Sequence, residues 1–150
     1  MSSPRSAEPA ATGHRLLLVD DEEAILFALE DYLAAAGWQV ATAASAAAAE
    51  ELLAASRFAV AVVDLRLSPE DDEHAGLGVV RRIRELSPQT RVVLLTAYGS
   101  RAVEEEARRL GVDSLLAKPQ PLAVLEKHLR ELAEGGGTAA AAPPSDATPG

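Results

Sequence analysis

The chain has 150 residues, enough for one domain with a substantial core, and its 48% hydrophobic and 25% charged residues are typical of a soluble globular protein rather than a disordered one. The formal net charge of -9 disfavours a general nucleic-acid-binding role, because neutralising phosphates requires clustered Lys and Arg. The absence of cysteine excludes disulfides, catalytic thiols and zinc–thiolate sites.

The two ends of the chain differ in composition from its middle. Residues 1–13 are rich in Ser, Pro and Ala and lack the apolar core of a signal peptide. Residues 135–150, GGGTAAAAPPSDATPG, are of low complexity. We therefore expect two disordered tails around one domain at residues 14–134. Since no segment is long and apolar enough to span a bilayer, we also expect a cytoplasmic protein without a membrane partner.

Between the tails, short apolar runs alternate with segments of helical spacing. After the first run, apolar residues from Ile25 to Ala36 fall on one face of a helix, and Gly37 is suited to end it. Pro121 is suited to the first position of a last helix. In chain order, we predict strands at Leu16–Val19, Gln39–Ala43, Phe58–Val63, Val92–Leu95 and Leu115–Ala117, and helices at Glu22–Ala36, Leu77–Leu86, Arg101–Leu110 and from Pro121 onward.

The strand pattern indicates the fold class. Most of the predicted strands are continuously apolar rather than alternating, as expected when both faces of a parallel sheet are covered by helices. Five strand–helix units in a domain of this length predict a doubly wound α/β fold. Ligands of such folds bind at the carboxyl ends of the strands, so the residues that follow each strand are the candidate site.

Polar side chains stand at the ends of four predicted strands: Asp20 and Asp21, Asp64, Thr96, and Lys118. Taken singly, each has an ordinary structural interpretation, such as a helix cap for Asp20 or Asp21. Taken together, three carboxylates at one sheet edge would repel each other, since unit charges 4 Å apart interact by roughly 4 kcal/mol at an effective dielectric of 20. Oxygen ligands without His or Cys favour a hard cation, so we expect Mg²⁺, with Thr96 and Lys118 holding phosphoryl oxygens.

Four stretches, VDDEEAILFALEDYLAAAGW, VVDLRL, VVLLTAYG and LLAKP, resemble in their order and spacing the receiver domain of two-component response regulators. The resemblance covers nearly all of residues 14–134. It implies a flavodoxin-like sheet with strand order 2-1-3-4-5. It also implies a phosphorylation switch rather than a turnover enzyme, with Asp64 as the residue that is phosphorylated.

The same resemblance assigns roles to the other candidate residues. Asp20, Asp21 and Asp64, with the carbonyl of Arg66, would bind Mg²⁺. Thr96 and Lys118 would contact the phosphoryl group, and the Lys118–Pro119 bond would be cis. A sensor histidine kinase or phosphotransfer protein would donate the phosphoryl group. A downstream protein would read the surface of the fourth helix, fifth strand and last helix, at roughly residues 100–134, without direct contact to nucleic acid.

The sequence departs from the family pattern at three places. The loop after Asp64 is longer and carries an acidic run at Glu70–Glu73, which either faces solvent or screens the pocket. Leu115 stands where the family often has the aromatic residue of its switch, and Tyr98 either contributes to that switch or only packs. Gln120 stands where the family commonly has Phe.

Three other functions are compatible with parts of the pattern. A phosphorylation-independent interaction domain on the same fold is left open by Leu115. A Mg²⁺-dependent phosphatase with an aspartyl-phosphate intermediate is disfavoured. Such enzymes carry a D-x-D motif after the first strand, whereas Asp20 and Asp21 are adjacent here. A nucleotide-binding module is disfavoured because no glycine-rich loop follows the first strand.

Overall fold

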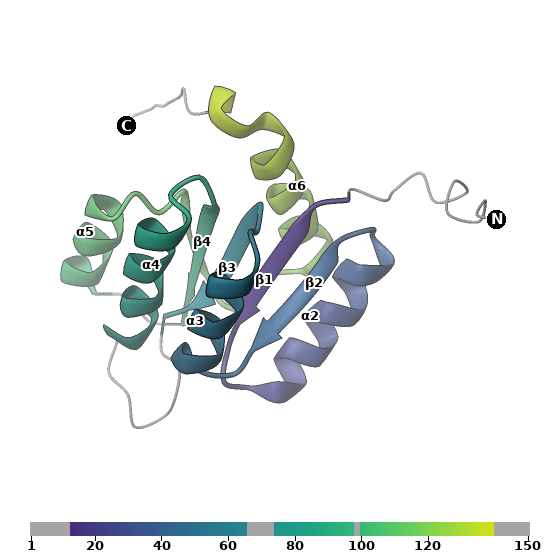
Figure 1. Cartoon of the computed structure of the whole chain (residues 1–150), viewed down its shortest axis with the longest axis horizontal. Helices are drawn as coiled ribbons and strands as arrows, with labels where there is room; N and C mark the ends of the chain where they lie inside the picture. Colours follow the sequence, from purple (N-terminus) through teal and green to yellow (C-terminus); the bar gives the residue numbers. More distant parts are fainter. Residues whose placement is uncertain (1–12, 66–73, 98–99, 140–150) are drawn as a thin grey trace.

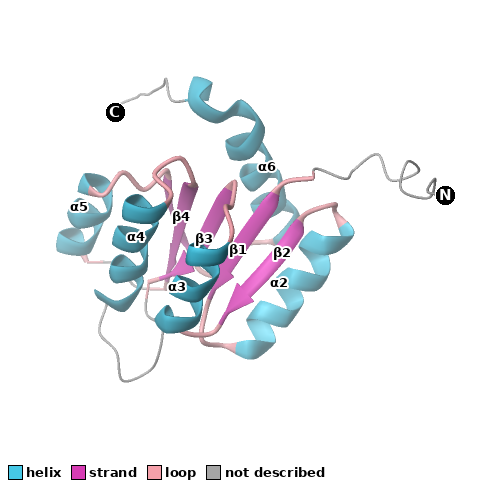
Figure 2. Cartoon of the chain, viewed as in Figure 1, coloured by secondary structure: helices cyan, strands magenta, loops and turns pink. Residues whose placement is uncertain are grey.

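The structure is a computed structural model that describes residues 13–65, 74–97 and 100–139. Five strands form one parallel sheet in the order β2-β1-β3-β4-β5 (Figures 1 and 2). The strands are β1 (Arg15–Val19), β2 (Gln39–Ala43), β3 (Val60–Asp64), β4 (Arg91–Thr96) and β5 (Ser114–Ala117). The predicted fold class, a doubly wound flavodoxin-like sheet with strand order 2-1-3-4-5, is confirmed.

Helices cover both faces of this sheet (Figure 2). One face packs against α3 (Ala46–Ala55), α4 (His74–Leu86) and α5 (Arg101–Arg109), and the other packs against α2 (Glu23–Ala35) and α6 (Leu122–Ala139). The two cores explain the continuous apolar runs. In β1, Leu17 belongs to the first core and Leu18 to the second, and both are 0–1% exposed. An apolar residue is therefore required at each of the four buried positions, Leu16–Val19.

The helices that differ most from the predicted ones are α3, α4 and α6, whereas α2 and α5 differ by one residue at their ends. No pattern delimited α3, whose Ala-rich sequence has little periodic contrast; its start is fixed by Ser45, whose hydroxyl accepts a hydrogen bond from Ala48 N at 3.1 Å. Helix α4 begins at His74, one turn before the predicted Leu77. Helix α6 continues to Ala139, past residue 134, where the C-terminal tail was expected to begin.

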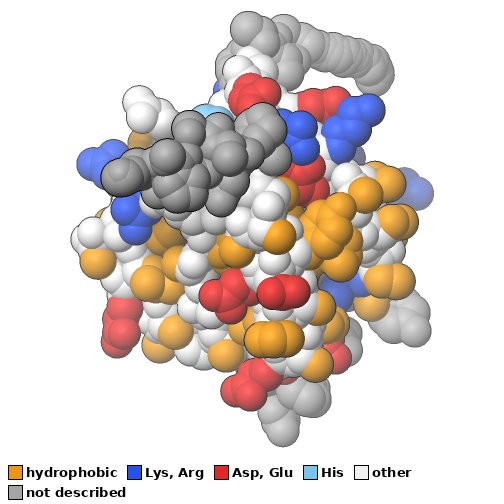
Figure 3. Space-filling model, turned by 90° about the vertical axis from the view of Figure 1, so that its right-hand side faces the viewer, with side chains coloured by type: hydrophobic (Ala, Val, Ile, Leu, Met, Phe, Trp, Pro, Cys, Tyr) orange, Lys and Arg blue, Asp and Glu red, His pale blue; other side chains and the backbone are white. Residues whose placement is uncertain are grey.

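The outer face of α2 is acidic and partly apolar. Figure 3 views the side of the molecule on which α2 and the edge strand β2 lie, and carboxylates are interspersed there with hydrophobic side chains. Phe27 of α2 is 71% exposed, and the helix contains Glu23, Glu30 and Asp31 but no Lys or Arg.

Among the described residues, no helix combines the length and the apolar character that crossing a bilayer requires.

Candidate functional site

Three carboxylates meet at the carboxyl edge of the sheet. Asp20 and Asp21 directly follow β1, and Asp64 ends β3; because Val19 is the register partner of Val63, Asp20 lies level with Asp64 on the neighbouring strand. One carboxylate oxygen from each of Asp20, Asp21 and Asp64 lies within 4.8 Å of the others. Asp20 is 3% exposed and Asp64 is 6% exposed, so much of this negative charge is shielded from water.

Lys118 reaches into this cluster from the end of β5. Its Nζ lies 3.1 Å from Asp20 Oδ2, 3.3 Å from Asp64 Oδ2 and 3.5 Å from Glu22 Oε1. Burial of the ammonium group lowers its pKa, but the hydrogen bond to Asp20 and the attraction of Asp20 and Asp64 outweigh this and raise the Lys118 pKa above its ordinary value. The Lys118–Pro119 peptide bond is cis, as the resemblance implied.

Two local interactions show how the backbone places these groups. Asp20 Oδ1 accepts a hydrogen bond from Glu22 N at 2.9 Å in the turn that precedes α2, and the other carboxylate oxygen of Asp20 contacts Lys118. The N-cap of α2 is Glu22, without a side-chain capping bond, so the helix-cap interpretation of Asp20 or Asp21 is wrong. On the other side, Lys118 N donates to Thr96 O at 2.9 Å, which keeps the ends of β4 and β5 together.

Thr96 presents a hydroxyl group that no described residue uses. Its Oγ1 is buried and has no hydrogen-bond partner in the described parts of the chain. The residue follows Leu95, the register partner of Asp64 on the adjacent strand. Since a buried polar atom without a partner costs free energy, this hydroxyl is a candidate to bind a group that enters the site.

The electrostatics of the site favour a bound cation. Burial raises the pKa of Asp21, and repulsion by Asp20 raises it further. The Lys118 ammonium carries one positive charge against three clustered carboxylates. A hard divalent ion fits this donor set, because all three side chains supply only oxygen and the set contains neither His nor Cys.

Gly76 is a site residue that the sequence analysis did not recognise as one. It lies in the first turn of α4, and its N–H donates to Leu65 O at 2.9 Å. A Cβ atom there would lie 2.4 Å from Asp64 O and 2.6 Å from Leu65 O. Only glycine lets α4 approach the end of β3 this closely, so Gly76 helps to set the backbone of Asp64.

Of the remaining predicted site residues, the structure describes Leu115, which is not part of the cluster. Leu115 of β5 is half-buried and packs against the core on the α5 side. With Ala107 and Val112 it lines a cavity of about 210 Å³ between α5 and β5. Arg66, Tyr98 and the acidic run at residues 70–73 lie outside the described residues. Glu22, not predicted as a site residue, joins the cluster through Lys118; its only sequence signal is the run of four acidic residues at 20–23.

Comparison with known proteins supports this picture. Residues 16–130 match the model of the response regulator receiver domain family. Over 104 residues, the chain is 36% identical to the photosynthetic apparatus regulatory protein RegA of Rhodobacter capsulatus, covering 69% of this chain and 54% of RegA. Over 105 residues, it is 40% identical to the alginate biosynthesis transcriptional regulatory protein AlgB of Pseudomonas aeruginosa, covering 70% of this chain and 22% of AlgB. The chain thus spans about half or less of the length of these two relatives.

Solved structures share the fold. A CheY-like receiver domain protein from Methanospirillum hungatei superposes with a TM-score of 0.76 at 24% identity, covering 83% of this chain and 96% of that one. A response regulator from Burkholderia pseudomallei, with a phosphorylated aspartic acid, a calcium ion and citrate, superposes with a TM-score of 0.70 at 29% identity, covering 85% and 73%. With five parallel strands in the order 2-1-3-4-5 and a match over residues 16–130, the chain belongs to the response regulator receiver domain family.

Proposed function

We propose that Asp64 accepts a phosphoryl group from the phosphohistidine of a sensor histidine kinase or phosphotransfer protein. The observation that carries this proposal is the position of Lys118 Nζ, 3.3 Å from Asp64 Oδ2 and beside two further carboxylates, near a strand end whose Thr96 hydroxyl has no described partner. The Burkholderia response regulator, which has a similar fold and holds a phosphorylated aspartic acid, supports the proposal.

The transfer exchanges one bond for another. An Asp64 carboxylate oxygen attacks phosphorus and forms an O–P bond, while the P–N bond to the donor imidazole breaks and its electron pair stays on the imidazole nitrogen. Lys118 donates hydrogen bonds to the phosphoryl oxygens, and the Thr96 hydroxyl gains the partner that it lacks in the described structure. Attack of water on the acyl phosphate later returns Asp64 to its carboxylate form.

Asp20, Asp21 and Asp64 are the residues proposed to hold Mg²⁺, with the Arg66 carbonyl as a further ligand. When bound, the ion would neutralise carboxylate and phosphoryl charge at the strand ends. The support for this is the oxygen-only donor set within 4.8 Å and the raised pKa of Asp21.

The proposal for signalling is a two-state equilibrium read by a downstream protein. Phosphorylation favours the state in which Thr96 and Lys118 close on the phosphoryl group, and the partner recognises the surface of α5, β5 and α6 in that state. A role for Leu115 and Tyr98 in this coupling is part of the proposal. So are a cytoplasmic location, a domain at residues 14–134 between two tails, and the absence of direct nucleic-acid contact, for which the net charge of -9 is the support.

A phosphorylation-independent interaction domain is the second candidate. Leu115 is the observation that favours it, because an aliphatic side chain packed against the core on the α5 side replaces the aromatic residue expected of the switch.

Intact mass after incubation with acetyl phosphate tests the proposal. We expect wild-type protein to gain one phosphoryl group in the presence of Mg²⁺ and none in EDTA. Asp64→Asn should remove the gain because the nucleophilic oxygen is lost, whereas Asp31→Asn, an exposed carboxylate of α2, should retain it. Labelling of Asp64→Asn at the wild-type level would refute the assignment, and no labelling of the wild type would favour the second candidate.

A further inference from the structure

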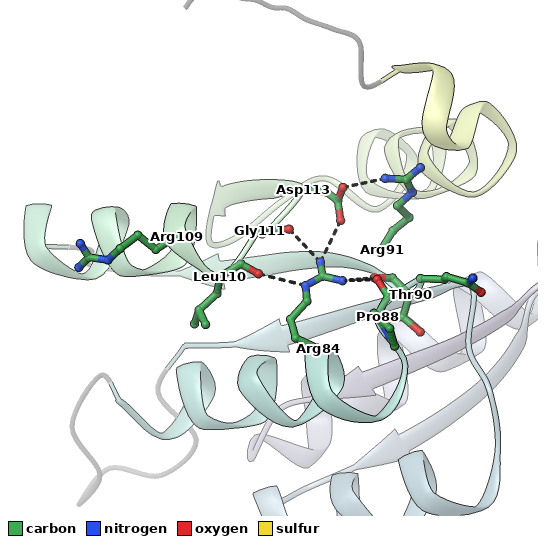
Figure 4. A pocket seen from close by; sticks show the side chains of 9 residues that line it. Arg84, Pro88, Thr90, Arg91, Arg109, Leu110, Gly111 and Asp113 are labelled. Atoms are coloured by element: carbon green, nitrogen blue, oxygen red, sulfur yellow. Dashed lines mark hydrogen bonds and ion pairs between the residues drawn. The ribbon is translucent and has the colours of Figure 1, made fainter.

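Arg84 forms a second polar cluster at the amino ends of β4 and β5, opposite the acidic cluster. It lies in the last turn of α4, and Figure 4 shows its guanidinium group among backbone oxygens of two connections. Its Nε donates to Leu110 O at 3.0 Å and its Nη2 to Gly111 O at 2.8 Å. Its Nη1 donates to both Pro88 O and Thr90 O at 2.9 Å. The guanidinium therefore joins the end of α5 to the α4–β4 connection.

The carbonyl groups that Arg84 binds belong to the terminus of α5. Leu110 caps the helix, and Gly111 has φ of +77°, the left-handed conformation that glycine favours. Gly111 N bonds to Arg108 O and Val112 N to Ala107 O, which closes the helix and leaves the Leu110 and Gly111 oxygens directed outward. A cation at this end also interacts favourably with the helix dipole. Arg84 therefore fixes the carboxyl end of α5.

Asp113 extends the cluster to β4 and β5. Its Oδ2 accepts from Val92 N at 2.8 Å, and its own N–H donates to Val92 O at 2.8 Å, so it is bonded twice to β4 immediately before β5 begins. Arg91 Nη1 lies 3.1 Å from Asp113 Oδ1, and Arg84 Nη2 lies 3.5 Å from Asp113 Oδ2. We call Arg84, Arg91 and Asp113, with these backbone groups, the Arg84 joint.

The cavity beside this joint, about 460 Å³, is lined by three arginines but does not form an anion site. Four N–H groups of Arg84 donate to carbonyl oxygens, and the guanidinium also forms an ion pair with Asp113. Arg91 is paired with Asp113, and Arg109 is paired with Glu106 and lies apart from the other two in Figure 4. The arginines hold the protein together and do not converge on an empty position.

We propose that the Arg84 joint is the fixed end of the surface formed by α5, β5 and α6. Phosphorylation would then pivot α5 about its carboxyl end at residues 110–111. This inference rests on the proposed function, which places the driving change at Thr96 and Lys118 on the opposite ends of β4 and β5. Charge-assisted hydrogen bonds are roughly twice as strong as neutral ones, and Arg84 makes four of them to backbone oxygens, so this end resists displacement. A pivot converts a small change at the site into movement of the amino end of α5.

Amide hydrogen exchange in the unphosphorylated protein tests the joint itself. Arg84→Lys retains the charge but loses the planar fork, so the amides of Gly111, Val112 and Asp113 should exchange about tenfold faster or more, as expected for losing one charge-assisted hydrogen bond. Arg82→Lys is the matched control, because Arg82 lies on the same helix and its described ion pairs, with Glu50 and Glu85, are at the surface. If R84K does not fold, D113N supplies the same test, since it removes the charge that faces Arg84 and Arg91.

Exchange with Mg²⁺ and beryllium fluoride, a phosphoryl mimic, tests the pivot. In wild-type protein, protection should change in the first turns of α5 and stay within twofold at residues 111–113. In R84K, the change should extend to residues 111–113. Equal exchange of R84K and wild type without the mimic would overturn the joint. A wild-type change at residues 111–113 as large as that at the start of α5 would overturn the pivot. Intact mass of the wild-type protein after incubation with acetyl phosphate tests the proposed function separately. If the protein gains no phosphoryl group, the proposed function is wrong and the proposed pivot is wrong with it.

Discussion

Single polar side chains at the carboxyl edge of the sheet differ in whether described residues satisfy their hydrogen bonds. Lys118 contacts Asp20 and Asp64 at 3.1 and 3.3 Å, while the Thr96 hydroxyl is buried without a described partner. Thr90, which directly precedes β4, is the opposite case. Its hydroxyl donates to Phe58 O and bonds to Ser87 Oγ, both at 2.7 Å. These two threonines therefore allow a direct comparison of an unsatisfied and a satisfied buried hydroxyl.

Thr96→Val should raise the free energy of unfolding of the unphosphorylated protein by about 1 kcal/mol, because it removes a buried hydroxyl that has no described partner. Thr90→Val should lower it by about 1–3 kcal/mol, because it leaves Phe58 O and Ser87 without their bonds. Chemical denaturation measures both. T96V should also slow labelling by acetyl phosphate. Destabilisation of T96V as large as that of T90V would show that the Thr96 hydroxyl is already satisfied.

At the level of secondary-structure elements, the contact between α4 and the end of β3 sets the backbone of Asp64. Gly76 N bonds to Leu65 O, and the glycine Cα faces Asp64 O and Leu65 O at a distance that excludes a side chain. Gly78, two residues later in the same helix, has no heavy atom within 4 Å of an added Cβ. Substituting each glycine by alanine therefore distinguishes the effect of close packing on stability from the effect of helix propensity.

Gly76→Ala should lower the free energy of unfolding by about 1–3 kcal/mol, since α4 or β3 must move to accept the methyl group. Because that movement reaches Asp64, acetyl phosphate labelling should slow as well. Gly78→Ala should raise the free energy of unfolding by about 0.5–1 kcal/mol through helix propensity and leave labelling unchanged. Thermal denaturation and intact mass give the two readouts. Gain of stability in both variants would mean that the approach at Gly76 relaxes freely.

At the level of the whole molecule, folding brings together carboxylates that are far apart in the unfolded chain. The raised pKa of Asp21 means that the folded state binds its proton more tightly than the unfolded state does. Ionised Asp21 therefore lowers the free energy of unfolding at a pH above its folded pKa, and this penalty declines as the pH falls through that pKa and is gone below the unfolded pKa. A divalent cation that binds only the folded cluster acts in the opposite direction.

Asp21→Asn should therefore stabilise the protein in EDTA at neutral pH, and the difference should vanish below the unfolded pKa of about 3.9. Mg²⁺ at a hundred times its Kd should add about 2.7 kcal/mol to the wild type and much less to D21N. Thermal denaturation across pH, with and without Mg²⁺, measures both effects. Asp31→Asn, an exposed control, should change stability by less than about 0.5 kcal/mol. Equal Mg²⁺ responses of wild type and D21N would remove Asp21 from the proposed metal site.

The sequence by itself determined the fold class, because local patterns carry it. Strands buried on both faces need apolar residues throughout, so Leu16–Val19 and Val92–Leu95 can be recognised as buried strands without tertiary information. Polar residues directly after such strands must lie at one sheet edge, so Asp20, Asp64 and Lys118 could be placed together from their positions alone. Helix α3 was not delimited because its mostly alanine residues give little contrast between faces.

Only the tertiary structure decided the interactions that depend on distance between remote segments. The close approach at Gly76, the absence of a described partner for Thr96 Oγ1 and the contact of Glu22 with Lys118 leave no periodic signal in the chain. The Arg84 joint likewise needs the ends of α4, α5 and β4 to be packed before one guanidinium can reach them. A residue's position along its own helix or strand predicts its face, whereas its partners are fixed only when the elements pack.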